Sequence, residues 1–217
     1  MKFTRIPETT FQKLQLNAGI LVSEFTPATG TVDETDIIGA TTGGVSFSAV
    51  ATYSDKGEDI DNCPINVKEL KQLDSWEVTM SGTFVTVDTN AAKLMIGAAD
   101  IDKSNTTLVK PRNDVLATDF QDIWWVGDYS DKNGDTNGGY VAIHMLNGLS
   151  TGGFQLQSSN RKKGNFEFEF TGHYSIDAQD TVPFEVYVKS GTAEPEAAKS
   201  GTDASDASKN ETTELKA

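Results

Sequence analysis

The feature that most constrains this chain is a strict alternation of apolar and polar residues. In the stretch NFEFEF, Phe166, Phe168 and Phe170 share one parity, while Glu167 and Glu169 take the other. Successive side chains of a β-strand point to opposite faces, so the alternation predicts a half-buried strand with an aromatic core face and an acidic outer face. Because most of the apolar signal in the sequence repeats with this period, we predict a mainly β protein.

Other apolar runs predict further strands. Residues 45–53, VSFSAVATY, alternate strictly, and residues 76–87, WEVTMSGTFVTV, alternate but change phase after Gly82. A glycine within a strand often marks a β-bulge, so we expect a bulge at Gly82. The remaining strands are expected at 14–25, 123–129, 140–146, 154–157 and 182–189, with the first interrupted around Asn17 and Gly19.

One α-helix is predicted, at about residues 88–99. Asp88 can cap its first turn, and the apolar residues that follow have the spacing i, i+3, i+4 and i+7. These residues are Ala91, Leu94, Met95 and Ala98. The spacing gives a single narrow apolar stripe, so we expect the helix to lie against the sheet.

Residues 54–75 form an unusually long connection between two strong strand patterns. Connections of this length usually carry a function or become ordered against a partner, so we interpret this one as an interaction element. The charged residues that we single out in it are Asp55, Glu58, Asp59, Asp61, Lys68, Glu69 and Lys71.

The stretch 128–139, DYSDKNGDTNGG, carries the oxygen ligands that calcium prefers. An EF-hand loop starting at Asp131 would need glycine at its sixth position and glutamate at its twelfth, but those positions hold Thr136 and Ala142. The Asn-Gly pairs instead suit a hairpin turn between two strands. A hairpin tip is therefore the favoured interpretation, and a calcium site stays open as the alternative.

Composition limits the function classes. The chain carries 32 acidic and 18 basic residues, a net charge of −14 that disfavours nonspecific binding to nucleic acid. Its one cysteine, Cys63, permits neither an intrachain disulfide nor a zinc site built on thiolates. No apolar stretch approaches the ~20 residues of a membrane span, and no export signal is recognisable. We expect synthesis without export and no membrane partner.

The sequence offers no recognisable enzyme site. The sequence places no serine or cysteine nucleophile with either of the two histidines, His144 and His173, so we interpret both as structural. Glu167 and Glu169 are two positions apart on one predicted strand, which is typical of a solvated face rather than a catalytic pair. The basic cluster RKKG at 161–164 is expected at a hairpin turn, where it could meet an acidic surface of a neighbour in an oligomer. We expect no enzyme activity and no cofactor.

Four stretches together resemble the major tail tube protein of long, non-contractile-tailed bacteriophages and related prophages of Gram-positive bacteria. The stretches are LQLNAGILVSEFTP, DIIGATTGGVSFSAVATYSD, WEVTMSGTFVTVDTNAAKLMIGAAD and FTGHYSIDAQDTVPFEVYV. The resemblance covers about residues 11–188 and rests on the order of elements rather than on a short motif. It leaves out the acidic, low-complexity segment 190–217, which we expect to be a disordered tail after a tail tube domain at 1–189.

The resemblance implies a β-sandwich or small barrel with a helix on its flank. It also implies stacked, hexameric rings that form the virion tail tube and that assemble in the bacterial host cytoplasm. The implied partners are further copies of the chain, tail tip, terminator and tape measure proteins, and genome DNA passing transiently through the lumen. The long connection would then stack rings, and Glu167 and Glu169 could line the lumen. The alternative is a monomeric β-sandwich module that binds carbohydrate or calcium.

Overall fold

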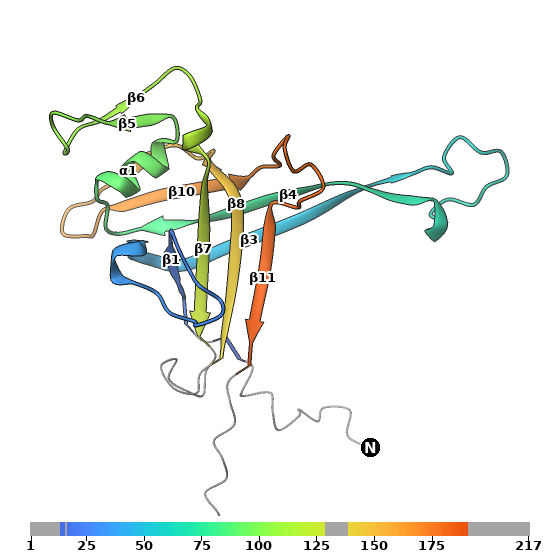
Figure 1. Ribbon diagram of the computed structural model, residues 1–217, viewed down its shortest axis with the longest axis horizontal. Helices are drawn as coiled ribbons and strands as arrows, with labels where there is room; N and C mark the ends of the chain where they lie inside the picture. The colour runs from blue at the N-terminus through green and yellow to red at the C-terminus, as the bar shows by residue number, and fades with distance from the viewer. Residues whose placement is uncertain (1–13, 16, 129–138, 191–217) are drawn as a thin grey trace, which may run out of the picture.

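Eleven β-strands and one α-helix form the described part of the chain, residues 14–15, 17–128 and 139–190 of a computed structural model (Figure 1). The strands are β1 (Ile20–Val22), β2 (Ile37–Gly39), β3 (Thr41–Asp55), β4 (Lys71–Phe84), β5 (Ala99–Ile101), β6 (Val109–Pro111), β7 (Gln121–Asp128), β8 (Tyr140–Ser150), β9 (Gln155–Gln157), β10 (Asn165–Gly172) and β11 (Phe184–Lys189). The helix is α1 (Thr89–Ile96), and short 3-10 turns are η2 (Glu34–Asp36), η3 (Lys68–Leu70) and η4 (Ala117–Asp119). The prediction of a mainly β fold is confirmed.

Nine of the strands form one antiparallel sheet in the order β2-β1-β7-β8-β10-β4-β3. In addition, β11 pairs with β8, and β9 pairs with β10, while β5 and β6 form a separate hairpin. Strand β8 connects the two halves of the sheet, because it pairs with β7 and β11 along most of its length and with β10 at its end. The layer containing β7, β8 and β11 consequently crosses the layer containing β3, β4 and β10 (Figure 1).

The change of direction between the layers occurs at Asn147 in β8. Asn147 has a φ of 49°, a left-handed conformation that asparagine tolerates better than most residues. Its backbone N–H donates to Asp122 Oδ1 at 3.0 Å, and its Nδ2 donates to the His173 carbonyl at 3.1 Å. His173 Nδ1 in turn lies 3.2 Å from the Asn147 carbonyl. This corner therefore ties together β7, β8 and the chain after β10.

The core lies between the crossed layers and is rich in aromatic and methionine side chains. Phe84 and Phe168 pack with ring centroids 4.3 Å apart, and Phe184 of β11 contacts both Phe47 and Trp76 across the layers. Burying one large apolar side chain contributes about 1.5–3 kcal/mol, so this cluster is the main stabilising element. The buried cluster consists of Leu21, Val78, Met80, Phe84, Leu94, Met95, Ile123, Met145, Phe168 and Phe170.

Helix α1 has the boundaries that its capping residues specify. The Asp88 side chain accepts a hydrogen bond from the Ala91 N–H at 2.7 Å, which is an N-cap interaction. Gly97, with a φ of 81°, ends the helix, so the predicted range 88–99 is slightly too long. The helix buries Ala91, Leu94 and Met95. The predicted apolar stripe is confirmed for these three residues, whereas its fourth member, Ala98, lies after the end of the helix.

The bulge predicted at Gly82 is on the wrong strand. The register shift lies in β3, where Gly43 and Gly44 are inserted opposite Gly82 with φ values of 77° and 85°. Strand β4 passes Gly82 without an insertion and ends at Phe84. The phase change in the sequence therefore reflects the end of a strand, and the positive φ values explain why glycines occupy the inserted positions.

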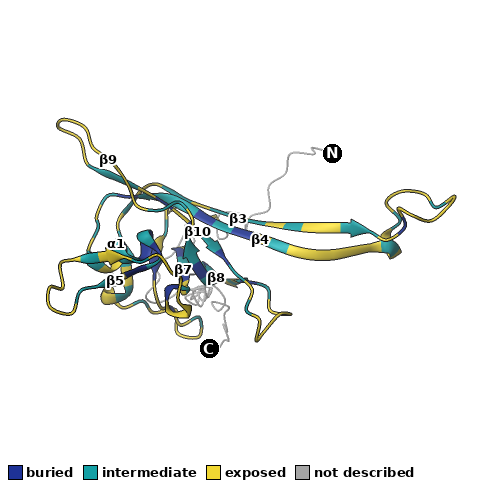
Figure 2. Ribbon diagram, turned by 90° about the horizontal axis from the view of Figure 1, so that it is seen from above, coloured by how far each residue is buried: buried dark blue, intermediate teal, exposed yellow. Residues whose placement is uncertain are grey.

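The predicted connection 54–75 is also wrong in its bounds. Strand β3 continues to Asp55 and β4 begins at Lys71, so the connection proper covers only 56–70. The two strands project from the body as a long arm with an exposed outer half (Figures 1 and 2). Residues 54–55 and 71–75 show no regular alternation of apolar and polar side chains, so the sequence did not reveal that they pair as the outer part of β3 and β4.

The corner gives a stability prediction. Asn147→Ala should lower the free energy of unfolding by roughly 1–3 kcal/mol, because alanine is strained at positive φ and removes the side-chain hydrogen bond to the His173 carbonyl. Asn147→Gly should cost less, because glycine adopts this conformation without strain. Urea unfolding of the two variants checks the order, and an alanine variant at least as stable as the glycine variant would contradict this account of the corner.

Candidate assembly surfaces

One face of the β3, β4 and β10 layer is formed almost entirely by hydroxyl and carboxylate side chains. Directly opposed residues in the three strands point to the same side, and the register places Thr42, Thr83 and Glu167 in one row. Up to the register shift after Thr52, the residues on this face are Thr42, Ser46, Ser48, Val50, Thr52, Ser75, Glu77, Thr79, Ser81, Thr83, Asn165, Glu167, Glu169 and Thr171. This polar face contains three carboxylates and no lysine or arginine.

The structure brings Glu167 and Glu169 together on the polar face. Both are exposed, and Glu169 is held by Thr151, whose Oγ1 donates to Glu169 Oε1 at 3.2 Å. The opposite side of β10 carries Phe166, Phe168 and Phe170 toward the core, as the alternation predicted. The sequence thus identified the two faces of β10, but it could not show that β3 and β4 extend the polar face.

The same layer has an open edge along β3 on one side and along the short strand β9 on the other, where β8 already pairs with Phe170–Gly172 of β10. Strand β3 pairs only with β4, and β9 pairs only with β10, within the described part of the chain. Open edges present unpaired N–H and C=O groups that can join another strand. The β3 edge runs along Thr41–Asp55 and carries no proline. The edges are therefore capable of pairing with further strands.

The end of the arm, residues 56–70, is ordered by its own hydrogen bonds. Asp55 Oδ1 accepts from the Gly57 N–H at 3.0 Å, and Asp55 Oδ2 accepts from the Asn66 N–H at 2.9 Å. These backbone donors, with Lys71 as a weaker contribution at 3.7 Å, lower the pKa of the Asp55 carboxyl below its ordinary value. Asp55 and Lys71 thus lie at the base of the tip and help to order it. The other charged residues predicted there, Glu58, Asp59, Asp61, Lys68 and Glu69, belong to the connection itself.

The outer surface of the tip combines acidic and apolar side chains. Ile60 is 53% exposed and Ile65 is 83% exposed, and both lie in the connection 56–70 at the end of the arm. The segment 56–70 carries four carboxylates against two lysines, and its ion pair between Lys68 and Glu69 is fully on the surface. The tip therefore presents both acidic and apolar side chains to the solvent.

Further exposed apolar residues lie on the arm and on β11, and the sequence pattern did not predict that they would be exposed. Tyr53 and Leu73 form a cross-strand pair on the arm and are 59% and 45% exposed. On β11, Val186 and Val188 are 51% and 62% exposed, although they lie on the same side of the strand as the packed Phe184. These side chains are apolar and would be expected in a core, but the single subunit does not bury them.

A second apolar cluster, which contains Val22, Phe25, Trp124, Val126, Tyr140 and Ala142, lies on the other side of β7 and β8. His144 stacks on Trp124 with ring centroids 3.8 Å apart, and its nitrogens lie 3.3 Å from Asp122 Oδ2 and 3.5 Å from Glu185 Oε2. The Tyr187 hydroxyl donates to the same Glu185 oxygen, and this bond lowers the pKa of Glu185. His144 and His173 both have structural contacts.

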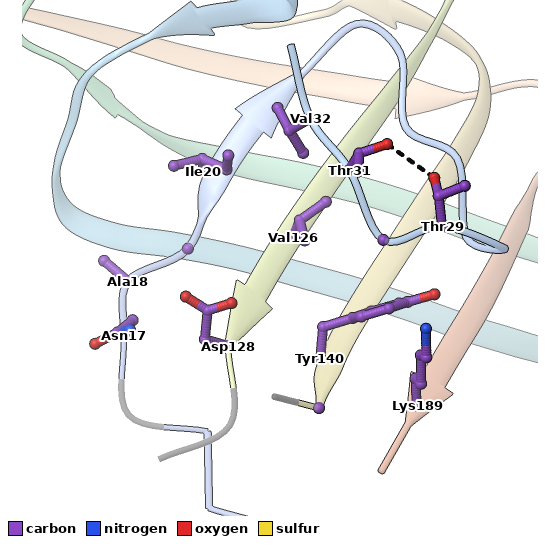
Figure 3. A pocket seen from close by; sticks show the side chains of 13 residues that line it. Asn17, Ala18, Ile20, Thr29, Thr31, Val32, Val126, Asp128, Tyr140 and Lys189 are labelled. Atoms are coloured by element: carbon purple, nitrogen blue, oxygen red, sulfur yellow. Dashed lines mark hydrogen bonds between the residues drawn. The ribbon is translucent and has the colours of Figure 1, made fainter. Parts of the chain in front are cut away.

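A cavity of about 620 Å³ lies at the ends of β7, β8 and β11 (Figure 3). Tyr140 and Lys189 line it, with the Lys189 Nζ 5.7 Å from the centroid of the Tyr140 ring, and Thr29 and Thr31 hydrogen-bond on its other side. The stretch 128–139, predicted as a hairpin tip or calcium loop, lies outside the described residues apart from Asp128 and Gly139. The predicted tail from 190 onward likewise lies outside them, except for Ser190.

Within the described ranges, no group of three or more histidine, cysteine, aspartate or glutamate side chains is placed to hold a metal ion. None of the helices described is long and apolar enough to cross a membrane.

No protein-family model matches this sequence, and no curated protein matches it. Solved structures that resemble the chain include one from the virion of a native gene transfer agent particle, which is 10% identical, covers 81% of this chain and 96% of that chain, and has a TM-score of 0.39. Another comes from the tail of an empty gene transfer agent particle with C6 symmetry, at 10% identity, 73% and 92% coverage, and a TM-score of 0.36. Similarities this low do not establish a shared function.

The role of Asp55 can be tested at the tip. Asp55→Asn should weaken the protection of the Gly57 and Asn66 amides from hydrogen exchange at neutral pH, because the carboxylate that accepts both bonds is lost. Since folding lowers the pKa of Asp55, its stabilisation is present above the ordinary carboxyl pKa and is lost as pH falls through the folded-state pKa. The difference between wild type and variant should therefore shrink in acid. Asp59→Asn is the matched control. If it reduces the protection of the Gly57 and Asn66 amides as much as Asp55→Asn does, Asp55 is not the residue that orders the tip.

Proposed function

We propose that this chain is a structural virion protein that assembles with copies of itself into stacked rings, forming the tail tube through which a phage genome is delivered. The observation that carries the proposal is the β3, β4, β10 and β9 layer, which combines a polar face, a core face and two open edges. The tube domain would be 1–189, and the location would be the virion tail, assembled in the host cytoplasm.

The direction of the strands supports closure into a ring. The four strands of the layer are successively antiparallel, so β3 and β9 run in opposite directions. When copies are arranged around an axis with the same face inward, the β9 edge of one meets the β3 edge of the next as an antiparallel pair. Closure removes open edges without any new element. The number of six subunits comes from the family resemblance of the sequence.

The composition of the polar face suits a lumen for DNA. Phosphates bind lysine and arginine, and bases stack on aromatic rings, but the polar face offers hydroxyls and carboxylates. DNA should therefore slide along such a wall without sticking to it. In this arrangement Glu167 and Glu169 face the lumen.

The arm and the exposed apolar residues support contacts between copies. Tyr53, Leu73, Val186 and Val188 lie beyond the region where the crossed layers cover each other, and a neighbouring subunit would bury them. The arm would reach an adjacent ring, with Glu58, Asp59, Asp61, Lys68 and Glu69 at its end. Tail tip, terminator and tape measure proteins would be the further partners.

Negative-stain electron microscopy of the purified protein over a concentration series tests the proposal, with and without a preformed tail-tip nucleus. Hollow filaments or rings are the expected result, because the edges and the arm are complementary surfaces of one chain. Persistent monomer under every condition would overturn the proposal in favour of a monomeric β-sandwich module, and calcium or carbohydrate titration would then follow.

The lumen assignment makes a separate prediction. Phage carrying Glu167→Lys with Glu169→Lys should assemble tubes but eject DNA more slowly, because lysines in the lumen would bind the phosphate backbone. Ejection is measured by DNA release on receptor addition. The matched control reverses two exposed charges off the polar face, Glu24→Lys with Glu34→Lys, and unchanged ejection in the first variant would remove both glutamates from the lumen.

A further inference from the structure

The β3, β4 and β10 layer has opposite charge at its two ends. The register fixes the ends: at one end Phe84 lies between Phe166 and Thr41, and at the other end Asp55 pairs with Lys71. The turn between β9 and β10 is at the first end, and the tip 56–70 is at the second. Because β3 has 15 residues and a strand rises about 3.3 Å per residue, the ends are roughly 50 Å apart.

The turn between β9 and β10 is basic and exposed. Arg161, Lys162 and Lys163 are consecutive, all exposed, and no acidic residue stands in the segment 158–164. In a chain with a net charge of −14, such a cluster is a local exception. Strand β9 and the residue before it add apolar surface, since Leu156 is 57% exposed and Phe154 is 43% exposed.

The tip 56–70 has the complementary character. It presents Glu58, Asp59 and Asp61 beside the exposed Ile60 and Ile65. Each end therefore offers apolar side chains next to charges, and the charges have opposite sign. Apolar contact surrounded by complementary charge is the usual composition of a specific interface.

We propose that the acidic tip of one copy docks on the basic turn between β9 and β10 of another copy. The contact is heterologous, because it joins two different surfaces, the tip of one copy and the turn of another. The two ends of one layer are too far apart to meet each other, so a copy that docks by its tip still has its turn free. Repetition of the contact extends an assembly along the direction of the arm. The inference rests on the proposed function and deepens it, since it names the receptor for the arm between rings.

Charge exchange tests the contact. A tip variant carries Glu58→Lys, Asp59→Lys and Asp61→Lys, and a turn variant carries Arg161→Glu, Lys162→Glu and Lys163→Glu. Each alone should raise the concentration at which tubes form by about tenfold or more, because like charges then face each other across the contact. The chain carrying all six substitutions should form tubes at a concentration close to that of wild type, because the charges at the contact are again opposite. A control with Glu24→Lys, Asp33→Lys and Glu34→Lys should assemble as wild type does.

Cross-linking locates the contact directly. In a Cys63→Ser background, Ile65→Cys with Asn160→Cys should give a ladder of disulfide-linked multimers on oxidation, because a heterologous contact continues from copy to copy. Ile65→Cys with Asn113→Cys, which moves the second thiol to the exposed loop after β6, should not give a ladder.

The outcomes separate the two ideas. If wild type forms tubes and both charge variants form them at the same concentration as wild type, the docking contact is overturned and the tube proposal stands. A disulfide ladder that appears only with Asn113→Cys would have the same meaning. Wild type that remains monomeric with and without a tail-tip nucleus would overturn the tube proposal together with this contact.

Discussion

The fold depends on the corner in β8, where one sheet becomes two crossed layers. A flat sheet of these strands would leave the aromatic side of β10 and β4 facing water, because burial needs a second layer. At Asn147 the backbone adopts a left-handed conformation, and hydrogen bonds to Asp122 and to the His173 carbonyl hold that turn. The core cluster forms between the layers only because β8 pairs with β7 and β11 before the corner and with β10 after it.

The subunit buries only part of the apolar surface that its strands carry. The arm continues beyond the crossed layers, and the strand β11 keeps Val186 and Val188 half exposed or more. Such surfaces are costly in a monomer and stabilising in an assembly, where a neighbour removes them from water. The open edges of β3 and β9 have the same character, since their backbone groups can be satisfied by another copy.

Charge is segregated in the described part of the molecule. The only charged groups on the polar face of the β3, β4 and β10 layer are carboxylates, the tip 56–70 is acidic, and the turn before β10 is basic. Exposed charges act over roughly 10 Å at moderate salt, so each cluster affects what touches it and little else. A single layer can therefore carry an acidic face and two ends of opposite charge as separate local surfaces.

The sequence by itself determined the strand character of β3, β4 and β10, the aromatic and acidic faces of β10, and the helix with its cap. These are local properties, because alternation, spacing and capping act over a few residues. Tertiary structure decided the position of the bulge at Gly43 and Gly44, the true length of the arm, and the union of three strands in one polar face. It also placed the basic and acidic clusters at opposite ends, because strand register joins residues that are distant in the chain, and no local pattern specifies that register.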